Sequence, residues 1–136
     1  MKHKPELDLA DLKRIAAAAE AEAHAHGWAV SIAIVDDGGH LLWLQRLDGA
    51  APISAQIAPA KANTAALGRR ESRIYEETIN QGRVSFLSVP GLQGMLEGGV
   101  PIVVDGQCLG AVGVSGVKSN EDAQIARAGI AALAQG

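Results

Sequence analysis

A few residues of the chain have the types and spacing needed to hold a small acidic ligand. Lys61 stands in an otherwise apolar stretch, and Thr64 follows three residues later, so a helix would present both on one face. Such a lysine must extend its ammonium to solvent, pair with a carboxylate, or line a pocket. If it lines a pocket, Arg46 at a predicted strand end and Glu97 before a double glycine are its candidate partners, with Lys61 and Glu97 as candidate catalytic groups.

His24 is the histidine best placed to bind a ligand that arrives from outside. His24 and His26 are two residues apart on a predicted helix, so their side chains point about 200° apart and cannot chelate one metal ion together. His26 falls on the apolar stripe, where we expect it to be packed. His24 faces outward, either as solvated surface or as an axial ligand to haem. His40 follows a turn with no second ligand beside it, and we expect no metal site.

Two sequence motifs that resemble catalytic loops fail on inspection. The stretch from Gly113 to Ser119 resembles a phosphate-binding loop, but Val117 stands where the Walker pattern requires glycine before Lys118. Ser115 does not lie in the G-x-S-x-G pattern of serine hydrolases. A single cysteine, Cys108, excludes an internal disulfide and is expected to be a buried packing residue.

The composition indicates one globular domain that spans residues 1–136. Hydrophobic residues make up 48% of the 136-residue chain and charged residues 20%, which is enough to bury a core. Aromatic residues are only 3% and the net charge is −3, so nucleic acid is not an expected partner. The chain has no apolar run long enough to span a membrane, and its charged start does not read as a signal peptide. We therefore expect a cytoplasmic protein without a membrane partner.

The elements that must position these residues alternate between helices and hairpins. Asp8 and Gly27 have the types expected at the two ends of a first helix. Ser54 is expected to cap a helix with Pro59 in its first turn and a body from Ala60 to Leu67. Ser119 to Asp122 has the form of a capping box that opens a last helix to about Ala134. The other expected segments are strands 29–36 and 40–46, a helix 72–80, an irregular stretch 81–94, and strands 100–104 and 108–115.

Tight hairpins produce antiparallel pairs, so the predicted fold class is α+β with one mainly antiparallel sheet of about five strands. Glycines at 110, 113 and 116 in the last predicted strand indicate that another part of the chain approaches its backbone closely.

Five blocks of sequence, taken in order, resemble the GlcG/HbpS family, which includes the C-terminal domain of PduO-type proteins. The blocks begin at Val35, Arg46, Lys61, Gly98 and Gly110. The resemblance implies a profilin-like α/β/α layer with helices on both faces of the sheet, assembled into dimers and often octamers. It also implies haem binding in some members, while other members belong to operons for glycolate, diol or aromatic acid catabolism.

Three functional hypotheses follow. The first is an oligomeric haem-binding accessory protein, in which His24 is the axial ligand, Arg46 or Lys61 meets the propionates, and Thr64 lies in the same site. The second is an enzyme or metabolite-binding protein of a catabolic operon, with Lys61, Thr64, Arg46 and Glu97 around an organic acid at a subunit interface. The third is a plain assembly protein. Because large apolar side chains are scarce, a large ligand is expected between subunits or on the surface.

Overall fold

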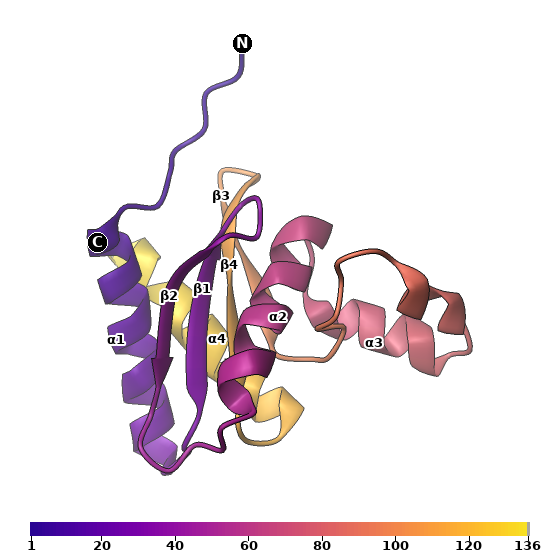
Figure 1. The fold of residues 1–136 in the computed structure, drawn as a ribbon. Coiled ribbons are helices and arrows are strands. Elements are labelled where there is room, and N and C mark those ends of the chain that lie inside the picture. Colours follow the sequence, from indigo (N-terminus) through magenta and orange to yellow (C-terminus); the bar gives the residue numbers. More distant parts are fainter. Residues whose placement is uncertain (136) are drawn as a thin grey trace.

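The protein is a three-layer α/β/α domain, described here for residues 1–135 of a computed structural model (Figure 1). Its antiparallel sheet has the strand order β2-β1-β4-β3. Helices α1 and α4 pack together on one face, and α2 covers the other. The elements are α1 (Leu9–His26), β1 (Ser31–Asp36), β2 (Leu41–Arg46), α2 (Ser54–Gly68), α3 (Ser72–Asn80), the 3-10 helix η1 (Val84–Ser88), β3 (Gly99–Val104), β4 (Gln107–Ser115), α4 (Ser119–Ala131) and the 3-10 helix η2 (Ala132–Gln135).

The predicted fold class is confirmed, but the sheet has four strands and not about five. The two predicted hairpins supply all four. The stretch 81–94, where a further strand had room, forms η1 and turns instead. Its glycines and prolines interrupt any alternation of apolar and polar residues, and a strand needs that alternation to bury one face.

Helix α1 forms as the sequence predicts because both of its ends are capped locally. The N–H of Asp11 donates to the Asp8 carboxylate at 2.9 Å, and Gly27 closes the helix in the left-handed region with φ 69°. The buried stripe of α1 consists of Leu12, Ile15, Ala16, Ala19 and Ala23. His26 differs from the prediction: it is exposed and stacks on the ring of Trp28 at 4.3 Å between centroids.

The two faces of the sheet carry residues of different size. Ile32 and Ile34 face the α1/α4 side, whereas Ala33 and Val35 face α2. Helix α2 therefore lies very close to the sheet, and a Cβ atom on Gly113 would collide with the carbonyl oxygen of Ala58. This confirms the close approach predicted for the glycines of β4. Gly110 and Gly116 meet the backbone of the β1 region in the same way.

Helix α2 begins earlier than the sequence predicts. Ile53 and not Ser54 occupies the N-cap, and Pro59 lies within the helix beyond its first turn. The hydroxyl of Ser54 instead donates to Ala51 O at 2.6 Å and shares a hydrogen bond with Ser31 Oγ at 2.8 Å. Ser54, which the sequence predicts as the cap, thus fixes the start of α2 to β1.

Helix α4 also begins one residue away from the predicted cap. Lys118 is the N-cap, and its N–H donates to the Glu121 carboxylate at 3.2 Å. Asp122, expected to complete a capping box with Ser119, is buried and turned inward. Within residues 1–135, no helix is both long and apolar enough to cross a membrane.

Candidate functional site

Lys61 is buried and pairs with a carboxylate, which is one of the three outcomes that the sequence allows. Only 3% of the residue is exposed. Its ammonium donates to Val114 O at 3.0 Å and to Asp122 Oδ2 at 3.1 Å. The missing side chain of Gly98 leaves the space that the end of this lysine fills. The ammonium is therefore enclosed by the protein and is not presented to a substrate.

Asp122 is the partner that sequence reasoning missed. It is 2% exposed, and its second carboxylate oxygen accepts the Val117 N–H at 3.1 Å. Burial raises the pKa of the Asp122 carboxyl, and the nearby Lys61 ammonium opposes that rise. A signal was present in the sequence, because a lysine in an apolar helix needs a carboxylate, but nothing local identified which one.

The remaining candidates of the acid-binding set do not all gather around Lys61. Thr64 is fully buried, and its hydroxyl has no hydrogen-bond partner in the described part of the chain. Arg46 is exposed at the end of β2, and its Nε donates to Ala50 O at 3.1 Å. Glu97 directly precedes Gly98, which contacts Lys61. The Glu97 N–H, however, donates to the Glu76 carboxylate of α3, and β3 is the edge strand opposite β2. A single chain therefore does not form one pocket from Lys61, Thr64, Arg46 and Glu97.

His24 lies apart from the other proposed haem contacts. It is exposed in the last turn of α1, and its imidazole makes no hydrogen bond or ion pair with residues 1–135. Lys61 and Thr64 belong to α2, on the other side of the sheet. The four residues expected to contact haem are thus divided between two faces of the protein.

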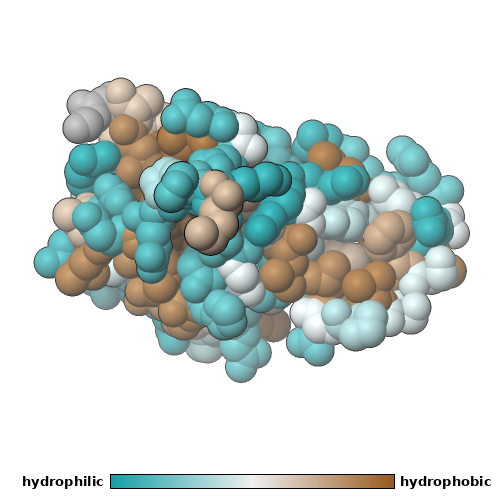
Figure 2. Space-filling view, turned by 90° about the horizontal axis from the view of Figure 1, so that it is seen from above, coloured by the Kyte–Doolittle hydropathy of each residue, from teal (hydrophilic) through white to brown (hydrophobic). Residues whose placement is uncertain are grey.

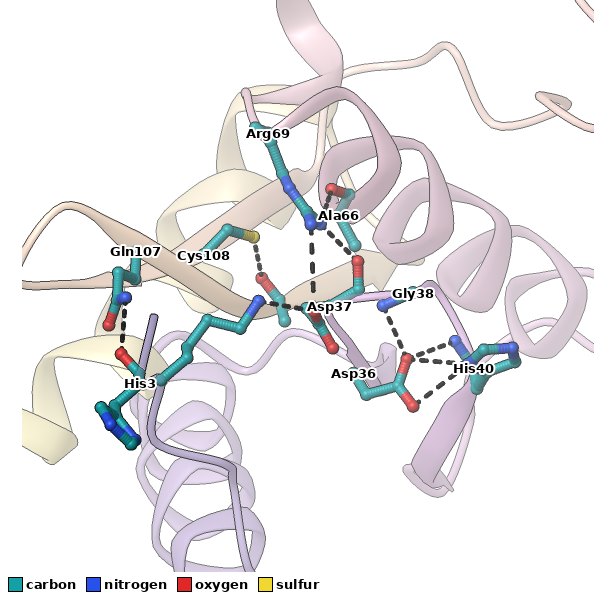
Figure 3. Close-up of polar contacts among 11 residues, drawn as sticks. His3, Asp36, Asp37, Gly38, His40, Ala66, Arg69, Gln107 and Cys108 are labelled. Atoms are coloured by element: carbon teal, nitrogen blue, oxygen red, sulfur yellow. Dashed lines mark hydrogen bonds and ion pairs between the residues drawn. The ribbon is translucent and has the colours of Figure 1, made fainter. Parts of the chain in front are cut away.

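A polar cluster joins the N-terminal segment to the β1–β2 turn and the end of α2 (Figure 3). The Lys4 ammonium lies 2.6 Å from the Asp37 carboxylate, and Arg69 donates to the carbonyl oxygen of Asp37. The hydrogen bond from Lys4 is the main reason that the pKa of the Asp37 carboxyl is lowered. These contacts attach the segment before α1 to the sheet.

The β1–β2 turn also contains a carboxylate and imidazole pair. The Asp36 carboxylate accepts the Gly38 N–H at 2.9 Å and lies 3.0 Å from His40 Nδ1. Asp36 therefore has the turn role that its sequence position predicts. The sequence did not reveal that it also orients the exposed imidazole of His40. Groups of three or more metal-ligating side chains are absent from residues 1–135.

Comparison with known proteins identifies the family. Residues 7–131 match the family described as haem degrading protein HbpS-like. The chain is 55% identical over 115 residues to Protein GlcG of Escherichia coli strain K12, and the match covers 85% of each protein.

Two solved structures share the fold over most of the chain. A double mutant of HbpS from Streptomyces reticuli has a TM-score of 0.88 at 33% identity, covering 98% of this chain and 90% of that one. The crystal structure of a PduOC:heme complex has a TM-score of 0.85 at 29% identity, covering 94% of this chain and 95% of that one. The family match over most of the chain and the 55% identity to GlcG establish that this protein belongs to the HbpS-like family.

Proposed function

We propose that this protein binds haem at its surface or between copies of the chain. The observation that carries the proposal is its similarity, over 94% of its length, to a PduOC domain whose crystal structure is a haem complex. The description of the family as haem degrading supports the same ligand. Neither comparison assigns a ligand residue.

The packing of the fold favours a surface position for the macrocycle. On the α2 side, the contact between Gly113 and the α2 backbone leaves no space between helix and sheet. On the other side, α1 and α4 enclose isoleucine and valine side chains of the sheet that are fully buried. A flat ligand as large as haem therefore fits outside these layers.

His24 is the axial ligand that we propose. Its imidazole is exposed and unengaged, whereas His26 stacks on Trp28 and lies 3.4 Å from Glu22, and His40 is held by Asp36. Arg46 is the exposed cation of the predicted set and is available for a propionate. Lys61 and Thr64 are buried in the single chain, so the proposal does not depend on them.

The proposal includes association of copies through the exposed side of β2. Leu41 pairs in register with Val35 and Leu44 with Ala33, so both leucines point to the α2 side of the sheet. Helix α2 packs mainly over β1 and β4 and leaves both leucines exposed. Ile53 and Leu67 of the α2 region are exposed as well. Exposed apolar side chains of this kind mark protein interfaces.

Titration with hemin tests the ligand assignment. Wild-type protein is expected to give a saturable Soret band, His24→Ala is expected to shift or abolish that band, and His26→Ala is the matched control on the same helix turn. A Soret band that is unchanged in His24→Ala and lost in His40→Ala would assign the axial ligand to His40 in the β1–β2 turn. No binding by the wild-type chain would remove the proposed function.

Light scattering after size exclusion tests the association. Leu44→Asp is expected to lower the oligomeric mass, because it places a charge in the interface. Val84→Asp, an exposed apolar residue of η1, is the control. Equal masses for both variants and the wild-type protein would contradict the proposed interface.

A further inference from the structure

A cavity of about 430 Å³ lies between α3 and the segment that leads into β3. This volume is within the range of small-molecule sites. The apolar side chains that line it are Ile79, Leu87, Leu92, Met95 and Leu96. In the view from above, apolar residues are exposed on the α3 half of the molecule as well as on the opposite half (Figure 2). None of the residues in this lining belongs to the predicted haem or acid-binding sets.

Hydrogen bonds fix α3 against the segment that leads into β3, beside the cavity. Ser72, the first residue of α3, is fully buried, and its hydroxyl donates to Leu96 O at 2.5 Å and accepts the Gly99 N–H at 2.8 Å. One turn later in the helix, the Glu76 carboxylate accepts the Glu97 N–H at 2.7 Å. These three bonds join α3 to residues 96–99, beside the cavity.

Glu76 gives the cavity its charge. One of its carboxylate oxygens is engaged by the Glu97 N–H, and the carboxylate forms no ion pair with any lysine, arginine or histidine of residues 1–135. The neighbouring Arg73 is paired with Glu77 instead, at 2.7 Å. The amide side chains of Asn80 and Gln93 are the other polar groups of the lining. A negative group, two amides and an apolar wall therefore converge on one space.

We propose that this cavity binds a small organic ammonium compound, with its apolar body against Leu87, Leu92 and Met95 and its cationic group on the Glu76 carboxylate. A charge-assisted hydrogen bond to a carboxylate is stronger than a neutral one, which would give the cation its preference. The proposed ligand is a cation, whereas the organic acid that the sequence alone suggested is an anion. The proposal is independent of haem binding, because His24 lies on a different element.

Calorimetric titration with three probes of similar shape tests the charge preference. The probes are the 2-phenylethylammonium ion, 2-phenylethanol and 3-phenylpropanoate. The ammonium ion is expected to bind at least about tenfold more tightly than the alcohol, and the carboxylate is expected not to bind. Glu76→Gln keeps the shape of the side chain and should lower the affinity for the ammonium ion to that for the alcohol. Equal affinity of the wild-type protein for all three probes would overturn the proposal.

Variants of the same helix separate the cavity from a general surface effect. Glu77→Gln removes an exposed carboxylate next to Glu76 and releases its partner Arg73, so it should weaken binding of the ammonium ion less than Glu76→Gln does. Asn80→Trp fills the cavity from its rim and should weaken the binding of both the ammonium ion and the alcohol. Loss of ammonium binding in Glu77→Gln as large as in Glu76→Gln would also contradict the site.

Two further outcomes would assign the cavity to another occupant. If Leu87→Asp lowers the oligomeric mass measured by light scattering, a second copy covers the cavity. If hemin displaces the bound ammonium ion, the cavity belongs to the haem site. Either result would overturn the proposal, and neither depends on whether His24 ligates haem.

Discussion

Lys61 of α2 and Asp122 of α4 form an ion pair of 3.1 Å inside the protein, although their helices cover opposite faces of the sheet. The ammonium reaches the N-terminal turn of α4 beside the end of β4, where Val114 O accepts its second hydrogen bond. Asp122 is in turn held by the Val117 N–H. The pair thus connects the two helical layers at a place where the small residues of the α2 face provide few large apolar contacts.

Removal of Lys61 alone is expected to destabilise the fold strongly. Lys61→Met leaves the Asp122 carboxylate buried without its cation, and breaking a buried pair in this way costs about 3–5 kcal/mol in the free energy of unfolding. Urea denaturation followed by circular dichroism measures the change. Lys13→Met, at an exposed lysine of α1, is the control. A loss below about 1 kcal/mol, the range of exposed pairs, would show that water reaches the site.

The double variant Lys61→Met/Asp122→Leu is expected to recover part of that loss. It removes both charges and replaces them with apolar side chains, a change that is often neutral in buried pairs. The two single substitutions should therefore not be additive. A double variant that loses the sum of the two single losses would contradict direct coupling between Lys61 and Asp122.

The stability of Lys61→Met is expected to depend on pH in a defined direction. The ordinary pKa of the Asp122 carboxyl is 3.8; burial raises it in the folded protein, and the Lys61 ammonium lowers it. Without the ammonium, this pKa rises further. Above pH 3.8 the folded variant then holds a proton that the unfolded chain has released. Its free energy of unfolding must therefore fall as the pH rises from 3.8 through the raised folded pKa of Asp122.

Urea titrations of the wild-type protein and of Lys61→Met across that pH range measure the difference between them. The difference should grow with pH. A constant difference would show that Asp122 stays ionised throughout, even without its partner.

The ends of elements differed in how well the sequence predicted them. Helix α1 was predictable because Asp8 and Gly27 cap it through local contacts. The start of α2 was not, because Ser54 uses its hydroxyl on Ser31 of a distant strand. Asp122 shows the same limit, since its sequence position is typical of a helix start and its buried role depends on Lys61, which is far away in the chain.

The cavity beside α3 could not be predicted from the sequence, for a different reason. The stretch 81–94 has no apolar period, so nothing in it predicts which side chains face inward. The segment beside the cavity is joined to α3 by bonds from Ser72 and Glu76 to the backbone at Leu96, Glu97 and Gly99, which are distant in sequence. The sequence drew attention to Glu97 as a candidate acid or base, whereas the structure places its backbone N–H on Glu76.

The contact between Lys4 and Asp37 is expected to give a small, salt-sensitive contribution to stability. The lowered pKa of Asp37 means that this contribution is present above the ordinary value of 3.8 and is lost as the pH falls through the folded value. Because both side chains are partly exposed, the contribution should stay below about 1 kcal/mol.

Asp37→Asn is therefore expected to be slightly less stable than the wild-type protein at neutral pH, and the difference should disappear as the pH falls through the lowered folded pKa of Asp37. Chemical denaturation at low and high salt measures both effects. A difference that persists unchanged in high salt would contradict the ion pair as its source.

Gly113→Ala is expected to destabilise the protein by about 1–3 kcal/mol or more, because the new methyl group has no space. It would press on the carbonyl oxygen of Ala58, which belongs to the helix backbone and cannot rotate away as a side chain could. Thermal unfolding measures the effect. An unchanged melting temperature would show that α2 can move away from the sheet at little cost.

Thr64→Val is expected to stabilise the fold, which is unusual for a substitution at a buried residue. The Thr64 hydroxyl is fully buried and has no partner within residues 1–135, so folding removes it from water without replacing its hydrogen bonds. Valine has nearly the same shape without the polar atom, and a gain of about 1 kcal/mol is expected in the free energy of unfolding. Thr78→Val is the matched control, since the Thr78 hydroxyl donates to Ile74 O at 2.8 Å and its removal should cost stability. A loss of stability in Thr64→Val as large as that in Thr78→Val would contradict an unpaired Thr64 hydroxyl.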